Sequence, residues 1–477
     1  MRGLIENLQP VWSEAILLLF VVFALLTSVR TTSGRARTQA DKRVMAGMLF
    51  SLLVLFSTDI PEKGVSVEGV SFVLDSGALY LKKLILIGAA VCVWFGSDWL
   101  KYKKYTRFEF SPLIGFSTAG MMLTVSAKTF LTQFLGLEMM HFPLLFLAAY
   151  KRYGERSTEA GTKYAIMVFL SSGLYLFGVS VLYACLGTID FSKIAAADKT
   201  ALMPALLWGL SFITTGLLLK LGAAPFHSWV ADVYEGAPSP VTALFLTIVR
   251  MTVIVAFARI VSGSLNSFMF YWKPVLSAVC ILSVVIGSFS AIVQTNIKRL
   301  AAYTAIALNG FAISALLSEK LSLLFLFLTA DLILTAGISA IILSLRVGEE
   351  LSEKVRILDG QGQAKPVRGA LFSLIFLGLS GAPPFAEFWT RFLLFKELTL
   401  NGMLWFAVFL MAGGLLIMFV YFRLIRKMYV TSTKEELSLA TLPVKTVILA
   451  TAFLSMFFFS FISPLSGFLK TALFSLG

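Results

Sequence analysis

The chain has 477 residues, of which 58% are hydrophobic and only 14% are charged, and 43 of them are phenylalanine. A water-soluble domain is nearer half apolar, with about a quarter of its residues charged, so this composition excludes an ordinary soluble fold and favours a membrane protein. The net charge of +14 does not indicate nucleic-acid binding, because the basic residues form short clusters between apolar runs.

Apolar runs long enough to cross a bilayer follow one another along the whole chain, and we expect about fourteen transmembrane helices. The first run, residues 14–29, precedes arginines rather than a small-residue cleavage site, which predicts a retained helix. Lys128 is the only obvious break between the fourth and fifth runs. The runs centre near residues 21, 51, 88, 118, 140, 175, 211, 251, 284, 310, 333, 377, 412 and 452.

The loops on one side hold about twice as many Lys and Arg residues as the loops on the other side. Because cytoplasmic loops are enriched in these residues, we expect both termini to face away from the cytoplasm. An even number of helices agrees with that orientation. The basic loops lie at residues 30–43, 101–107, 151–156, 298–299, 346–368 and 423–445.

One short pattern occurs twice. Gly222-Ala-Ala-Pro225-Phe is followed by Trp229, and Gly381-Ala-Pro383-Pro384-Phe is followed by Trp389. Paired broken helices in two halves of a chain are typical of a transport path near the interface of the repeats. The alternative is that Gly, Ala and Pro simply end two membrane helices.

Several ionisable residues fall inside apolar runs, where a charge is costly and usually faces a protein or water interior. A buried carboxylate beside a buried amine shifts the proton affinity of both, which suits a proton relay. The alternative is a set of structural ion pairs or snorkelling side chains. The candidates for the proton path are Glu138, Lys163, Lys220, Arg250, Asp331, Glu387 and Arg391.

The sequence lacks the residue patterns that bind redox cofactors and nucleotides. The only histidines are His141 and His227, too few for two bis-histidine haems, and the three cysteines lie far apart with no CxxC pair. No GxxxxGK[ST] phosphate loop occurs. We therefore expect no cofactor or metal in this chain, and energy supplied by a partner or an ion gradient.

Residues 219–243 (LKLGAAPFHSWVADVYEGAPSPVTA) closely resemble the antiporter-like membrane subunits of proton-pumping NADH:quinone oxidoreductase, respiratory complex I. The part from Asp232 onward resembles subunit N more than subunits L and M or the multisubunit sodium/proton antiporters. Further similar segments are Gly136–Met140, Glu159–Tyr164, Gln294–Leu300 and Gly381–Pro384, so the resemblance extends from about residue 110 to 430.

The resemblance implies an all-α, polytopic fold with two inverted five-helix repeats and broken seventh and twelfth helices. It divides the chain into N-terminal helices (1–109), a first repeat (110–265), a second repeat (266–430) and a C-terminal helix (431–477). The helix breaks would lie at Gly222 and Pro225, and at Gly381, Pro383 and Pro384.

The resemblance also implies roles for single residues. Glu138 would pair with Lys220, Lys163 would modulate that pair, and His227 would lie in a loop where a gating role and a plain hydrogen bond are equally open. Arg250 and Arg391 stand where the family has lysines, and arginine does not give up its proton. We therefore expect the two arginines to act as fixed charges, with Asp331 and Glu387 as the titrating groups. Leu308 replaces a histidine of the family, so one link is expected through water or Asn309.

The function implied is proton translocation by a membrane-arm subunit, driven by electron transfer in other subunits. NAD, FMN, iron–sulfur clusters and quinone are expected in those partner subunits, and the location expected is a bacterial inner membrane. Two alternatives stay open: a subunit of a multisubunit sodium/proton antiporter, and a structural subunit that no longer pumps.

Overall fold

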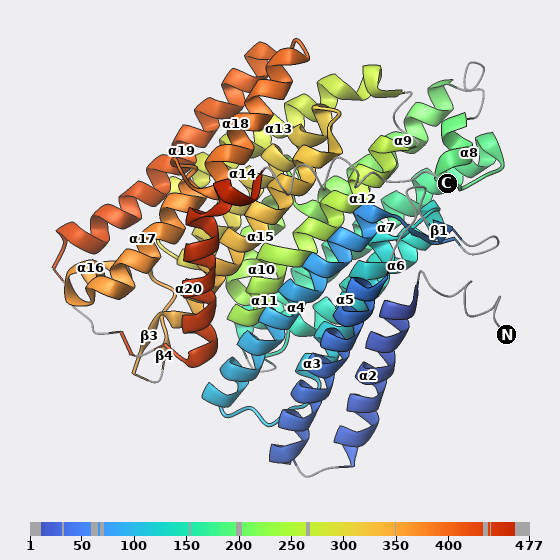
Figure 1. The fold of residues 1–477 in the computed structure, drawn as a ribbon. Coiled ribbons are helices and arrows are strands. Elements are labelled where there is room, and N and C mark those ends of the chain that lie inside the picture. The colour runs from blue at the N-terminus through green and yellow to red at the C-terminus, as the bar shows by residue number, and fades with distance from the viewer. Residues whose placement is uncertain are drawn as a thin grey trace.

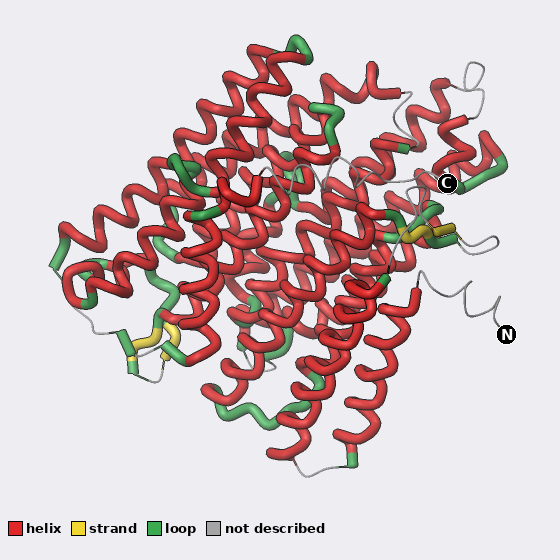
Figure 2. The backbone as a smooth tube through the Cα atoms, in the orientation of Figure 1, coloured by secondary structure: helices red, strands yellow, loops and turns green. Residues whose placement is uncertain are grey.

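A computed structural model describes residues 11–30, 33–58, 65–66, 71–151, 154–196, 203–263, 268–348, 350–432, 437–438 and 440–462. Parts of the basic loops used above to orient the chain, including Arg152 and Lys434, and residues 463–477 of the C-terminal region lie outside these ranges. Nearly all the described residues form helices that lie side by side (Figures 1 and 2).

The helices account for every apolar run of the sequence. Their bounds are α2 (Trp12–Val29), α3 (Ser33–Ser57), α4 (Ser76–Tyr102), α5 (Phe110–Val125), α6 (Phe130–Ala148), α7 (Glu155–Leu186), α8 (Phe191–Ala196), α9 (Met203–Leu221), α10 (Ser228–Gly236), α11 (Ser239–Leu244), the π-helical turn η2 (Phe245–Val249), α12 (Arg250–Ser262), α13 (Met269–Ile292), α14 (Ile297–Leu317), α15 (Leu321–Ser344), the 3-10 helix η4 (Val355–Leu358), α16 (Gln361–Ala364), α17 (Pro366–Ser380), α18 (Ala386–Leu400), α19 (Leu404–Val430) and α20 (Leu442–Met456). The first helices, α2 and α3, lie at one side of the molecule and α19 at the other, while α20 returns to pack on α15 and α17 (Figure 1).

Ten of the described helical segments are long and apolar enough to cross a bilayer, and three shorter apolar helices, α5, α17 and α20, accompany them. The chain is therefore a multi-pass, mainly α-helical membrane protein. The predicted break near Lys128 is present, because α5 ends at Val125 and Thr129 caps α6 by accepting a hydrogen bond from the Thr132 amide.

Burial separates central helices from peripheral ones. In the most apolar 18-residue stretch of each segment, all residues of Ser239–Ser262 and 94% of those of α14 are buried, compared with 33% in α2 and 39% in α7. The outer helices therefore expose large apolar side chains such as Leu26 and Phe169, as a helix in contact with lipid does. Arg250 lies in the segment Ser239–Ser262, and Asp331 lies in α15, which is 89% buried over the same kind of stretch.

Two short antiparallel hairpins mark the opposite ends of α4. β1 (Val65–Ser66) and β2 (Val73–Leu74) lie just before α4, and the Val73 amide donates to the Ser126 carbonyl. β3 (Arg346–Val347) and β4 (Glu350–Leu351) lie near its other end, where Arg346 pairs with Asp98 at 2.8 Å. We call these two ends of the molecule the β1–β2 face and the β3–β4 face (Figure 1).

The two helix breaks have the same backbone arrangement. α9 ends before Gly222 (φ 68°) and α17 before Gly381 (φ 75°), in the left-handed region that glycine adopts without strain. The next residue in each break, Ala223 or Ala382, donates its amide to a carbonyl of the preceding helix at 3.1 or 3.2 Å. The repeated sequence pattern therefore corresponds to a repeated local structure.

Candidate functional site

The first buried cluster joins α6, α7 and α9. The Lys220 ammonium lies 3.1 Å from the Glu138 carboxylate and donates to the Ser172 hydroxyl at 2.9 Å. Ser172 in turn donates to Glu138 at 2.5 Å. The Lys220 side chain is fully buried, while that of Glu138 is 27% exposed at the surface of the chain. The pairing implied by the resemblance is present, and its role in proton transfer stays a prediction.

Asn309 of α14 connects this cluster to the centre of the molecule. Its Nδ2 donates at 3.0 Å to the carbonyl of Leu221, the residue that follows Lys220 and ends α9. Its Oδ1 accepts from Arg250 at 3.2 Å. The carbonyl at the end of a helix has no partner within its own helix, so Asn309 also satisfies a group that the break leaves free.

The second cluster is an ion pair between Arg250 of α12 and Asp331 of α15, both buried. Arg250 also donates to the carbonyls of Ala305 and Leu246, at 3.2 and 3.3 Å. The π-helical turn η2 ends directly before Arg250, and such turns occur frequently at functional sites. Several acceptors around one guanidinium fix its position, as expected for a stationary charge.

The third cluster lies at the second helix break. Glu387 and Arg391 form an ion pair of 3.2 Å on one face of α18, as their spacing predicted. Arg391 also donates to the carbonyls of Ser380 and Leu379 at the end of α17, both at 3.2 Å. Arg391 is therefore a structural cap of the broken helix as well as a buried charge.

Two carboxylate oxygens of this row have no protein hydrogen bond among the described residues: Oδ1 of Asp331 and Oε1 of Glu387. Both residues are buried. A buried carboxylate with one free oxygen can accept a proton there without first breaking its ion pair. Each of these two groups thus has one oxygen available for a proton, and their titrating role stays a prediction.

Lys163 and His227 lie outside these three clusters. Lys163 forms its ion pairs with Asp232 at 2.6 Å and Glu159 at 2.7 Å, not with Glu138 or Lys220. His227 lies in the turn before α10, and its carbonyl accepts from the Val230 amide. Any influence of Lys163 on the Glu138–Lys220 pair therefore acts without a direct contact.

Further polar residues belong to the site although no pattern in the sequence marks them. Ser172 bridges the first pair, and the hydroxyl of Tyr164 lies 2.6 Å from Nδ1 of buried His141, one helical turn after Glu138. Serine and tyrosine are common in membrane helices, so hydropathy alone gives no signal for them. Their positions follow from which helices pack together.

Among the described residues, no group of three or more His, Cys, Asp and Glu side chains is placed to hold a metal ion. Cys92 and Cys280 are buried, Cys185 is half-buried, and all three are free thiols.

Residues 127–416 match the family model described as NADH:quinone oxidoreductase/Mrp antiporter, transmembrane. NADH-quinone oxidoreductase subunit N of Rhodospirillum rubrum is 36% identical over 419 residues, which cover 87% of this chain and 86% of the relative. The chain belongs to the subunit N family of NADH-quinone oxidoreductases. Subunit N of Granulibacter bethesdensis is 34% identical over 457 residues, covering 93% of this chain and 95% of the relative.

Solved structures share the fold. A chain of respiratory complex I from Thermus thermophilus superposes with a TM-score of 0.82 at 24% identity, over 95% of this chain and 98% of that one. A chain of the Mrp complex from a Dietzia species gives 0.81 at 19% identity, over 96% of both chains. At these identities the likeness to solved structures concerns the fold alone. The assignment to the subunit N family rests on the sequence relatives.

Proposed function

We propose that this chain is a proton-translocating membrane-arm subunit of an NADH:quinone oxidoreductase, with electron transfer carried out by partner subunits. The observation that carries the proposal is the connection between buried charges. The Glu138–Lys220 pair leads through the Leu221 carbonyl and Asn309 to the Arg250–Asp331 pair. Such a row transmits a change in one pair to the next, because each charge shifts the proton affinity of its neighbours.

The surface position of Glu138 supports a signal from outside the chain. Its side chain is 27% exposed on a helix in the apolar part of the molecule, while its partner Lys220 is fully buried. A neighbouring membrane subunit in contact with α6 would alter the field at Glu138 and thereby the strength of the pair. The coupling step of the proposal is this change at the Glu138–Lys220 pair.

The finer architecture is part of the same proposal. We assign about fourteen membrane crossings, an inverted repeat of residues 110–265 and 266–430, N-terminal helices in 1–109 and a C-terminal helix in 431–477. The equal backbone hydrogen bonding of the two breaks supports the repeat. We place the β3–β4 face in the cytoplasm of a bacterial inner membrane, with both termini on the other side, because the basic loops gather on the β3–β4 face.

The test is Glu138→Gln in the assembled complex, with Glu109→Gln, an exposed carboxylate in the loop before α5, as the matched control. We expect NADH-driven proton translocation in membrane vesicles to fall several-fold in the first variant and to stay unchanged in the second. Equal pumping by both variants would reject the role of the pair. Dependence of the transport on sodium would instead favour the antiporter alternative.

A further inference from the structure

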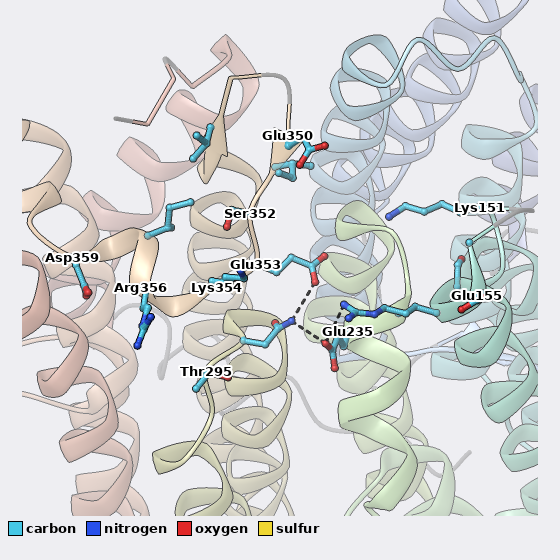
Figure 3. A pocket seen from close by; sticks show the side chains of 18 of the residues that line it. Lys151, Glu155, Glu235, Thr295, Glu350, Ser352, Glu353, Lys354, Arg356 and Asp359 are labelled. Carbon is cyan, nitrogen blue, oxygen red and sulfur yellow. Dashed lines mark hydrogen bonds and ion pairs between the residues drawn. The ribbon is translucent and has the colours of Figure 1, made fainter. Parts of the chain in front are cut away.

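A cavity of about 1710 Å³ opens on the β3–β4 face, between α7 and α10 on one side and the segment after α15 on the other. Its lining is rich in charge. Figure 3 shows Lys151, Glu155, Glu235, Glu350, Glu353 and Arg356 around it, with the amine of Lys151 directed into the space. The buried row described above does not include these residues, so the cavity requires its own explanation.

Glu353 is held at the cavity by backbone bonds. The Ile297 amide donates to the Glu353 carbonyl, and the Val355 amide donates to the Thr295 carbonyl, both at 2.8 Å. These bonds fix the segment after β4 against the start of α14. Asn296 adds a side-chain link, because its Nδ2 donates to Glu353 at 3.2 Å and to Glu235 at 3.0 Å (Figure 3).

Below the cavity lies Lys298, in the first turn of α14. Its side chain is 1% exposed, and its ammonium lies 2.7 Å from the Glu353 carboxylate, which is 26% exposed. Lys298 also donates to the carbonyls of Ala237 and Glu235, at 2.9 and 3.3 Å. The ion pair therefore separates an open, charged cavity from the protein interior.

The interior beyond Lys298 leads to the centre of the charged row. Ala305 lies two helical turns further along α14, about 10 Å away by the rise of an α-helix, and its carbonyl accepts from Arg250. The residues of α14 between them on the same face are Ala301 and Ala302, whose small side chains fill little space. The face of α14 thus runs from the cavity floor toward the Arg250–Asp331 pair.

We propose that this cavity is a proton-intake vestibule, and that the Glu353–Lys298 ion pair in its floor is the gate to the Arg250–Asp331 pair. This inference rests on the proposed function and deepens it, because it assigns the intake route. A proton that binds a Glu353 oxygen neutralises the carboxylate and removes its attraction for Lys298. Lys298 stays bonded to the carbonyls of Glu235 and Ala237, so the carboxylic acid is the group released to turn inward.

Lys151 is the group suited to deliver that proton. Among the described residues its ammonium forms no hydrogen bond or ion pair, and its one ring contact is with Trp99, whose centroid lies 5.8 Å away. Burial, reinforced by the charge of Lys298, lowers the pKa of Lys151 to about 8. An amine with a pKa near the ambient pH both takes and releases protons readily. The charged groups that act on it are Lys103 at the end of α4, Lys298 on α14 and Glu353, while Glu155 and Arg156 of α7 line the same cavity.

The transfer balances in protons. One proton leaves Nζ of Lys151 and binds an oxygen of Glu353, and Lys151 then takes another from the solvent. Burial acts to raise the pKa of Glu353, but the Lys298 ammonium and the Asn296 amide outweigh it, so the pKa lies below its usual range. Glu353 is therefore ionised at rest and binds a proton less tightly than Lys151 does. The transfer runs uphill, so the gate stays closed until the coupled change in the charged row drives a proton onto Glu353.

The first test compares Glu353→Gln with Glu350→Gln, an exposed carboxylate of the same cavity, in the assembled complex in vesicles. We expect NADH-driven proton translocation to fall several-fold in the first variant and to match the unmodified complex in the second. Wild-type pumping by Glu353→Gln would overturn the gate. If the Glu138→Gln variant also pumped protons at the normal rate, the proposed function itself would fail. If Glu138→Gln pumped slowly while Glu353→Gln pumped normally, only the gate would be rejected.

A second test avoids any loss of folding caused by breaking the ion pair. Lys151→Arg keeps the charge but holds its proton, and no hydrogen bond within the described structure is removed. We expect several-fold slower pumping from neutral to alkaline pH, with Lys354→Arg, an exposed lysine of the same cavity, as the unaffected control. Wild-type rates for Lys151→Arg throughout that range would overturn the delivery step.

Discussion

Arg250 donates to Asn309 at 3.2 Å, and this bond joins the helix that carries the central arginine to the helix that caps the first break. Asn309 uses both ends of its amide, one toward Arg250 and one toward the Leu221 carbonyl. Among the described residues, no other side chain is hydrogen-bonded both to the end of α9 and to Arg250. The continuity of the charged row therefore depends on an uncharged residue.

Replacing Asn309 with Leu should interrupt the row while preserving its charges. Arg250 would keep its bonds to Asp331 and Ala305 but lose one acceptor, and the Leu221 carbonyl would lose its donor, at a cost of roughly 1–3 kcal/mol for each buried group left unpaired. We expect an assembled complex with several-fold slower proton translocation. Ser314→Ala on the same helix, whose hydroxyl bonds only within α14, is the control.

Asp331→Asn tests which group titrates. The amide keeps the shape of the carboxylate but cannot accept a proton near neutral pH, and it leaves the Arg250 guanidinium without a countercharge. We expect a several-fold fall in the rate of NADH-driven proton translocation. Thr335→Val, one turn further along α15, removes a hydroxyl that bonds to its own helix and should have little effect. Full pumping by the Asp331 variant would count against the titrating role.

Arg391→Met should destabilise the second break. It leaves Glu387 buried without its ion pair and frees the carbonyls of Ser380 and Leu379, and breaking a buried pair from one side costs about 3–5 kcal/mol. A lower unfolding temperature of the detergent-solubilised complex would reveal the loss.

The double variant Arg391→Met/Glu387→Gln should recover part of that loss, because the uncompensated buried charge is gone while the carbonyls remain free. A double variant as unstable as Arg391→Met alone would show that the carbonyl contacts, rather than the ion pair, account for the effect. Additivity of the two single changes would show that the residues do not interact.

Gly381→Ala should be harmful for two reasons. Gly381 has φ 75°, where an L-residue pays roughly 1–2 kcal/mol, and an added Cβ would lie 2.6 Å from an Arg391 nitrogen. We expect a lower thermal unfolding temperature and reduced assembly. Gly173→Ala in α7 is the control, because no atom lies within 4 Å of its added Cβ and alanine is the better helix former.

The order of the helices and the presence of buried charges followed from the sequence. The apolar runs fell within helices because a bilayer imposes a length on each crossing, which is a local property of the chain. The i,i+4 spacing of Glu387 and Arg391 likewise determined their pairing, since both residues lie on one helix. The two Gly-Pro segments predicted the breaks because they combine a glycine, which readily ends a helix, with a proline, which cannot donate the next helical hydrogen bond.

The partners of the other charges depended on the tertiary structure. Nothing local in the sequence pairs Arg250 with Asp331, directs Lys163 to Asp232, or brings Glu353 against Lys298, because these contacts join helices and loops far apart in the chain. The sequence by itself determined that charges lie within the membrane and that two helices are broken. Only the packing of the helices decided which charges meet, since the distance between two side chains on different helices is set by how those helices cross.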